Sequence, residues 1–211
     1  MGSTSISIQE LENQEEYDLI LRLDHQEILP FIQEEFERRN FLIHLYIAIN
    51  IALVTASIFF GIEQWFAGTM PAWKMLVFLV IGAVLGSTLI VPIHELIHGL
   101  VYYMLGAPKV SYGWNLESFY FYAVADRFII DNRGIWPLAL APFFLISGLC
   151  IWGIIYFNGI IEWSLWGLLI MHSLNCLGDF GVLSFFWEHR QKRIYTYDLV
   201  DQSLSFFYAK K

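Results

Sequence analysis

The sequence predicts an all-α polytopic membrane protein with four transmembrane helices and a small β-like or re-entrant insertion between the second and the third. Of its 211 residues, 57% are hydrophobic and only 15% are charged, whereas soluble domains average about 45–50% and about 25%. Four apolar runs are each long enough to cross a bilayer core of about 30 Å at about 1.5 Å per residue. These runs cover residues 41–62, 75–105, 136–157 and 163–187. Tryptophans stand at or near their ends, as interfacial aromatic residues do, namely Trp65, Trp73, Trp136, Trp163 and Trp187.

Charge and cysteine content exclude two other classes of protein. The net charge is −8, so the chain has no basic surface with which to neutralise nucleic-acid phosphates. Cys150 and Cys176 both lie in apolar runs and lack the CxxC spacing. They therefore suggest neither a disulfide framework nor a cysteine zinc site.

The first 40 residues form an acidic segment that we expect to be helical and cytosolic. Leucines and isoleucines recur in it at roughly helical spacing, which predicts one or two surface helices broken near Pro30. Residues 1–40 would thus precede a four-span core over residues 41–188, and a cytosolic tail would occupy residues 189–211.

Basic residues predict the orientation of the four spans. They gather before the first run, between the second and third, and after the fourth, which by the positive-inside rule are cytosolic. Both termini and the connection over residues 106–135 are therefore expected in the cytosol. The basic residues concerned are Arg38, Arg39, Lys109, Arg127, Arg133, Arg190, Lys192 and Arg193.

The connection between the second and third runs has an alternating pattern. Val110, Tyr112 and Trp114 alternate with smaller or polar residues, and a second alternating stretch covers residues 119–124. This favours two short strands with a turn near residues 115–118. An amphipathic interfacial loop is the alternative.

Small residues in the apolar runs predict close helix contacts. Gly82 and Gly86 form a GxxxG pattern, which lets two membrane helices approach closely. We expect the same role for Gly148, Gly153 and Gly167.

The second apolar run contains an HExxH motif. His94 and His98 are four residues apart on a predicted helix, so both imidazoles can reach one metal ion. Glu95 lies between them, where it could act as general base, and the usual interpretation is a zinc site. Ionisable residues within an apolar span are costly and are usually functional. The alternative is a pair of structural histidines, with Glu95 hydrogen-bonded to one of them.

A catalytic zinc site usually needs a third protein ligand, and the fourth run offers candidates. His172, Asn175 and Asp179 share one face of a predicted helix. We favour Asp179 as the third ligand, since a lone carboxylate in a span needs a partner. His172 is the rival ligand, although it would be better suited to orient another ligand or relay a proton.

These motifs resemble those of the site-2-protease-type intramembrane metalloproteases, and more closely those of the small bacterial zincin peptidases related to them. The resemblance rests on HELIHGL at residues 94–100, ALAPFF at 139–144 and NCLGD at 175–179. It implies one zinc ion per chain, held by His94, His98 and Asp179, with Glu95 as the catalytic base. It also implies that Asn175 helps to hold the substrate peptide. The Asp-Gly pattern of the larger proteases is altered, and no PDZ-like domain is apparent.

The combined interpretation is a zinc-dependent intramembrane endopeptidase in a bacterial cytoplasmic membrane. Its partners would be the lipid bilayer and a membrane-protein or peptide substrate, which a strand between residues 110 and 124 could receive by edge pairing. One alternative is a haem protein that uses His44, His94, His98 and His172 as ligands. Another is a scaffold that binds zinc without cleaving anything.

Overall fold

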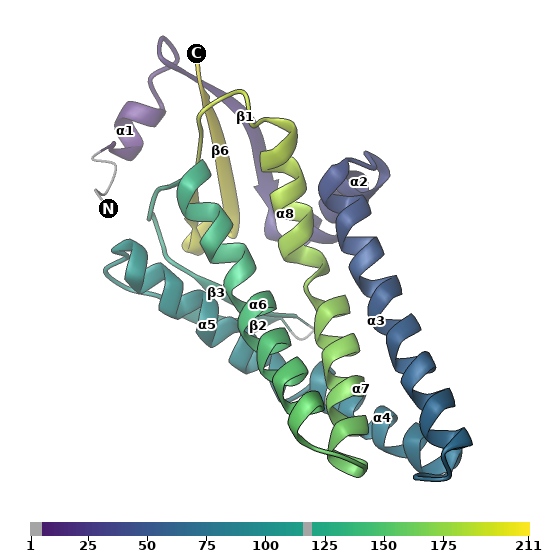
Figure 1. The fold of residues 1–211 in the computed structure, drawn as a ribbon. Coiled ribbons are helices and arrows are strands. Elements are labelled where there is room, and N and C mark those ends of the chain that lie inside the picture. The colour runs from purple at the N-terminus through teal and green to yellow at the C-terminus, as the bar shows by residue number, and fades with distance from the viewer. Residues whose placement is uncertain (1–5, 116–119) are drawn as a thin grey trace. The chain divides into compact units, whose positions relative to one another are not determined.

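The computed structural model describes residues 6–115 and 120–211, and its element order can be followed in Figure 1. The chain forms two compact units. The first, here called the sheet unit, comprises residues 1–43, 95–141 and 178–211. The second, the helical unit, comprises residues 44–94 and 142–177. Several helices therefore begin in one unit and end in the other.

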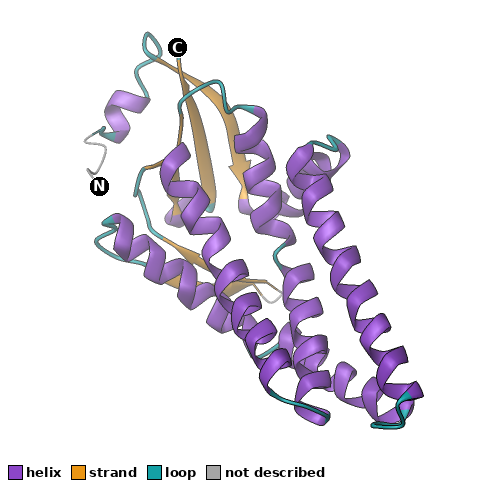
Figure 2. Ribbon diagram, viewed as in Figure 1, coloured by secondary structure: helices purple, strands orange, loops and turns teal. Residues whose placement is uncertain are grey.

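The protein is mostly helical, as the sequence predicts, with 66% of residues in helices (Figure 2). Two helices, α3 (Phe41–Phe66) and α6 (Asn132–Tyr156), are each long and apolar enough to cross a membrane. Two bent pairs pass the same test together, α4–α5 (Ala72–Ser87 and Ile90–Leu105) with a bend of 43° and α7–α8 (Ile160–Asn175 and Leu177–Glu188) with a bend of 41°. Up to four spans are therefore compatible with the described residues. The helices are α1 (Ile8–Leu11), α2 (Ile28–Glu37), α3 (Phe41–Phe66), α4 (Ala72–Ser87), α5 (Ile90–Leu105), α6 (Asn132–Tyr156), α7 (Ile160–Asn175) and α8 (Leu177–Glu188), with 3-10 turns at His25–Glu27 and Val200–Gln202.

The bend between α4 and α5 has a local cause. Pro92 lies in the first turn of α5, has no N–H, and its ring would clash with the carbonyl of Thr88 in a continuous helix. Thr88 accordingly leaves the helical conformation, with φ −122° and ψ −75°. The apolar run over residues 75–105 is thus two helices, and the HExxH motif falls in the second.

The break between α7 and α8 is stabilised by a tyrosine on α3. Cys176 ends α7, and a helix end leaves carbonyl groups without intrahelical partners. The Tyr46 hydroxyl lies 3.1 Å from the Ser173 carbonyl oxygen and 2.9 Å from that of Leu174, so it can donate to either. These three residues belong to the helical unit.

Glycines bring α4 and α7 together in the helical unit, which confirms part of the small-residue prediction. A Cβ atom at Gly82 would overlap the carbonyl oxygen of Ser164, and one at Gly167 would overlap that of Leu79. The expectation for Gly148 is wrong, because no described atom lies within 4 Å of a Cβ built there. Its place in an apolar run was insufficient evidence of a helix contact.

The sheet unit contains a four-stranded antiparallel sheet, so the prediction of an all-α fold is wrong for this unit. Its strand order is β1-β6-β5-β4. The expected helix across the middle of residues 1–40 is wrong, since β1 occupies this stretch and pairs with β6 at the other end of the chain. Pro30 does not break α2, because it lies in the first turn, where proline is tolerated. The strands are β1 (Tyr17–Asp24), β4 (Ile130–Asp131), β5 (Ile194–Leu199) and β6 (Leu204–Lys210).

The two strands predicted in the connection are confirmed. β2 (Ser111–Asn115) pairs antiparallel with β3 (Tyr120–Val124), in a register that places Ser111 opposite Val124. Most of the predicted turn, residues 116–118, lies outside the described residues. The linear division into segments 1–40, 41–188 and 189–211 remains a prediction.

The apolar core of the sheet unit contacts α5 and α8, the helices that carry the candidate site residues His98 and Asp179. Val101 of α5 and Leu183 of α8 are buried in one cluster with residues of α2 and β6. Ile32 of α2 also lies close to Gly181, where a Cβ atom would meet its side chain at 3.1 Å. The core therefore fixes α5 just after His98 and α8 just after Asp179.

A buried glutamate in this unit predicts a specific pH dependence of stability. Glu35 is 1% exposed, accepts a 2.7 Å hydrogen bond from Ser184 Oγ and lies 3.0 Å from Arg38 Nε. Burial raises the pKa of its carboxyl above the ordinary value of 4.5, and the nearby Glu34 and Glu188 add to this, while Ser184 and Arg38 oppose it. The folded protein thus retains a proton that the unfolded chain releases, so stability falls as the pH rises above about 4.5.

We expect Glu35→Gln to flatten this fall. Urea unfolding of the purified protein at a series of pH values from 4 upward should show the variant gaining stability relative to wild type as the pH rises. Glu37→Gln is the matched control, since Glu37 is an exposed glutamate of the same helix. Parallel pH profiles for wild type and Glu35→Gln would contradict the prediction.

Candidate metal centre

The HExxH motif lies on α5, and the helix brings its three functional side chains together. His94 and His98 are buried, Glu95 is half-buried, and one possible ligand atom from each lies within 4.8 Å of the others. This spacing comes from one helical turn of α5 itself. The motif thus has the local geometry that the sequence predicts.

His98 is held so that one ring nitrogen is directed at a carboxylate. Its Nδ1 lies 2.9 Å from the carbonyl oxygen of Leu138 and can donate its proton there. Its Nε2 lies 3.2 Å from Asp179 Oδ1. A neutral imidazole that carries its proton on Nδ1 has a lone pair on Nε2. A lone pair and a carboxylate oxygen that face each other at this distance need a cation between them, either a proton or a metal ion.

The carbonyl that orients His98 is available because of a proline. In a regular helix the carbonyl of Leu138 would accept from the N–H of residue 142. That residue is Pro142, which has no N–H. The carbonyl of Leu138 is therefore free of its usual α-helical partner and can accept from His98. This gives a physical role to the proline of the ALAPFF segment.

Asp179 lies in the first turn of α8, immediately after the break at Cys176. The positive end of a helix dipole stabilises a carboxylate in this position. The Asp179 side chain is 16% exposed and that of His98 is 11% exposed, so their interaction is largely removed from solvent. The structure thus brings the favoured third ligand against one of the two motif histidines.

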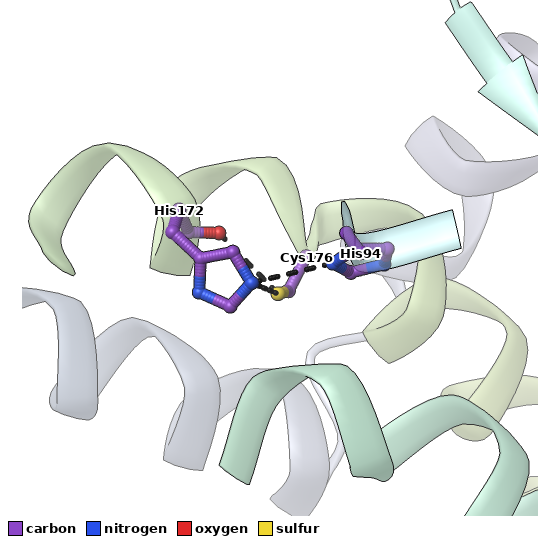
Figure 3. Close-up of side chains that lie close together, drawn as sticks. All are labelled: His94, His172 and Cys176. Carbon is purple, nitrogen blue, oxygen red and sulfur yellow. Dashed lines mark hydrogen bonds between the residues drawn. The ribbon is translucent and has the colours of Figure 1, made fainter. Parts of the chain in front are cut away.

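The rival ligand, His172, lies against the other motif histidine. Its Nε2 is 3.3 Å from His94 Nδ1 and 3.8 Å from Cys176 Sγ. Figure 3 shows the three side chains and the interactions that join them. All three side chains are buried, and their possible ligand atoms lie within 4.8 Å of one another. Sequence reasoning missed Cys176 because it considered only cysteine pairs. The signal was the four-residue spacing between His172 and Cys176.

Asn175, expected to hold the substrate, is hydrogen-bonded to another helix. Its Nδ2 donates to the Gly86 carbonyl oxygen at 3.1 Å. Gly86 is in the last turn of α4, where carbonyl groups have no intrahelical partners. The amide of Asn175 therefore has a structural role at the end of α4.

The donor sets and their spacing suit a zinc ion. His98 faces a carboxylate, and His172 faces a second imidazole and a thiol. For zinc bonds of about 2.0–2.1 Å in a tetrahedron, two N or O ligands lie about 3.3 Å apart. The 3.2 Å between His98 Nε2 and Asp179 Oδ1 fits this spacing.

Comparison with known proteins agrees with the chemistry of these residues. The sequence model of a family described as "Putative zincin peptidase" matches residues 87–194, about half of the chain. The match includes the HExxH motif, Pro142, His172 and Asp179. No curated protein and no solved structure matches the chain.

The role of Pro142 can be tested by restoring the missing N–H. In Pro142→Ala the carbonyl of Leu138 should return to its helical hydrogen bond and release His98, so we expect zinc affinity to fall by about 10- to 100-fold. Zinc titration against a competing chelator measures this. Thermal stability should not fall, because the helix gains a hydrogen bond.

Pro137→Ala is the matched control, since Pro137 lies in the same helix five residues earlier. It should leave zinc affinity unchanged. Equal affinities for wild type and Pro142→Ala would show that the Leu138 carbonyl does not orient His98.

Proposed function

The chain belongs to the zincin peptidase family, and on this premise we propose that it is a zinc-dependent intramembrane endopeptidase. Its substrates would be membrane-embedded or membrane-proximal peptides. The observation that carries the proposal is the 3.2 Å approach of His98 Nε2 to Asp179 Oδ1, with the other nitrogen of His98 held by the Leu138 carbonyl.

We assign zinc to His94, His98 and Asp179. The last two already lie at the spacing of zinc ligands, and His94 is one turn from His98 on the same helix. Two imidazoles and a carboxylate with an open fourth position are a typical catalytic zinc set. Bound there, zinc would polarise a peptide carbonyl and lower the pKa of water.

Glu95 supplies the proton transfers in this proposal. It is half-buried and adjoins His94 on α5, so its carboxylate can accept a proton from the attacking water. It then returns that proton to the leaving amine, which completes the hydrolysis. Asn175 remains our candidate to position the substrate, through an amide whose donor already contacts Gly86.

The β2–β3 hairpin is the proposed substrate-binding edge. A Cβ atom at Gly99 would overlap the Tyr112 hydroxyl, so the hairpin packs against α5 one residue after His98. Among the described residues, β3 pairs only with β2. Its other edge can accept an extended peptide, which a transmembrane substrate would form by local unwinding.

The apolar helices support a membrane setting. Two helices are long and apolar enough to span a bilayer, or up to four spans are possible if each bent pair of helices is one span. We propose a bacterial cytoplasmic membrane with both termini in the cytosol, as the distribution of arginine and lysine indicates.

Glu95→Gln separates catalysis from zinc binding. The variant should retain about one zinc ion per chain and lose nearly all cleavage, because the amide cannot accept the proton. Zinc content is measured on the purified protein, and substrates are sought as membrane proteins that accumulate in Glu95→Gln cells. Asp179→Asn should also lower cleavage, because it removes a proposed ligand of the catalytic zinc ion.

Glu63→Gln is the control for general effects of charge, since Glu63 is an exposed residue of α3. It should leave both measurements unchanged. If Glu95→Gln cells show the same membrane proteins and the same fragments as wild type, the peptidase proposal fails. A protein that still binds zinc would then be a scaffold.

The substrate edge has its own test. Ala123→Pro removes a backbone N–H and restricts β3, so we expect cleavage to fall about tenfold or more at unchanged zinc content. Phe121→Ala, which keeps the N–H in the same strand, is the control for side-chain loss. Full cleavage by Ala123→Pro would remove the support for edge pairing.

A further inference from the structure

A second group of metal-binding side chains lies in the helical unit, and the proposed mechanism uses only one of its members. His172 and Cys176 are 1% and 0% exposed, and both lie close to His94 (Figure 3). His172 Nε2 is the central atom, 3.3 Å from His94 Nδ1 and 3.8 Å from Cys176 Sγ. Cys150, the other cysteine of the sequence, is not a member of this group.

These distances match the spacing of zinc ligands. Tetrahedral bonds of about 2.0–2.1 Å to nitrogen and about 2.3 Å to sulfur place two nitrogens about 3.3 Å apart and nitrogen and sulfur about 3.6 Å apart. The observed separations are 3.3 Å and 3.8 Å. Two imidazoles and a thiolate are donors that zinc prefers. Burying three such groups in an apolar environment costs free energy, and residues of this kind are usually kept for a function such as ligand binding.

We propose that His94, His172 and Cys176 form a second zinc position, which competes with the catalytic position for His94. The site itself rests on the three side chains of the helical unit, and the competition rests on the proposed function. Zinc would bind His94 through Nδ1, His172 through Nε2 and Cys176 through its thiolate. The thiol proton is released to solvent when the metal binds.

The competition follows from the chemistry of one imidazole. A neutral histidine has one nitrogen with a lone pair and one that carries a proton. Zinc on His94 Nδ1 therefore leaves the proton on Nε2, which can no longer bind a metal ion. Zinc on Nε2 conversely leaves a proton on Nδ1, which can be donated to His172. One zinc ion per chain can thus occupy either position, and the position with Cys176 leaves the catalytic set without His94.

The consequence is a metal-loaded but inactive state. Removing Cys176 should shift zinc toward the catalytic position, because a thiolate is lost from the competing set. Removing Asp179 should shift zinc the opposite way. The two variants therefore predict opposite changes in sulfur ligation, which a purely structural role of Cys176 would not produce.

The test uses cobalt as a spectroscopic probe of the full-length protein in detergent. Co²⁺ titration of wild type should give a thiolate-to-metal charge-transfer band, which Cys176→Ser abolishes and His172→Ala weakens. The band should persist in Asp179→Asn, and in Cys150→Ser, which replaces the one other cysteine. X-ray absorption of the zinc-loaded wild type should show a sulfur ligand at about 2.3 Å. This measurement needs no substitution in the protein.

Wild type that binds Co²⁺ with no thiolate band, and zinc with no sulfur ligand, would overturn the proposal. His172 and Cys176 would then serve only to orient His94. This result would not affect the peptidase proposal, because that proposal is tested separately by comparing cleavage in wild-type and Glu95→Gln cells. A band in Asp179→Asn together with unchanged cleavage in Glu95→Gln would support the second position and end the peptidase proposal.

Discussion

The pairing of His98 with Asp179 is the constraint on which the candidate site depends. An imidazole nitrogen and a carboxylate oxygen face each other at 3.2 Å with little access to solvent. Removing such groups from water is unfavourable unless each has a partner. The Nδ1 of His98 is fixed by a contact with the Leu138 carbonyl. The pair is therefore prepared to share a cation, and its chemistry points to zinc.

Three irregular positions in the helices determine where the motif, the Leu138 carbonyl and Asp179 lie. Pro92 ends α4 and lets α5 begin just before the motif. Pro142 leaves the Leu138 carbonyl free for His98. The break at Cys176 starts α8, so that Asp179 falls in its first turn. A regular helix uses its own carbonyl groups internally, and these irregularities release backbone groups where side chains need them.

The sequence predicted the local arrangement of the HExxH side chains better than the fold around them. HExxH is a local pattern, and its spacing on a helix determines which side chains can meet. The apolar runs were equally local, although run length did not reveal the breaks at Thr88 and Cys176. The strand β1 was missed because its partner β6 lies at the other end of the chain. Its leucines, spaced at two residues, were assigned to a helical period, and only the pairing decides between these alternatives.

His172 shows why a ligand set is harder to predict than a motif. The sequence placed His172 and Asp179 on one predicted helix face, which made them rivals for one site. The break at Cys176 separates them into α7 and α8, and each then contacts a different motif histidine. His94 Nδ1 approaches His172, while Asp179 approaches His98. Two residues that are rival ligands in the sequence thus have different partners. A neutral imidazole offers one lone pair, so in our proposal a zinc ion bound with Cys176 would leave the catalytic position without His94.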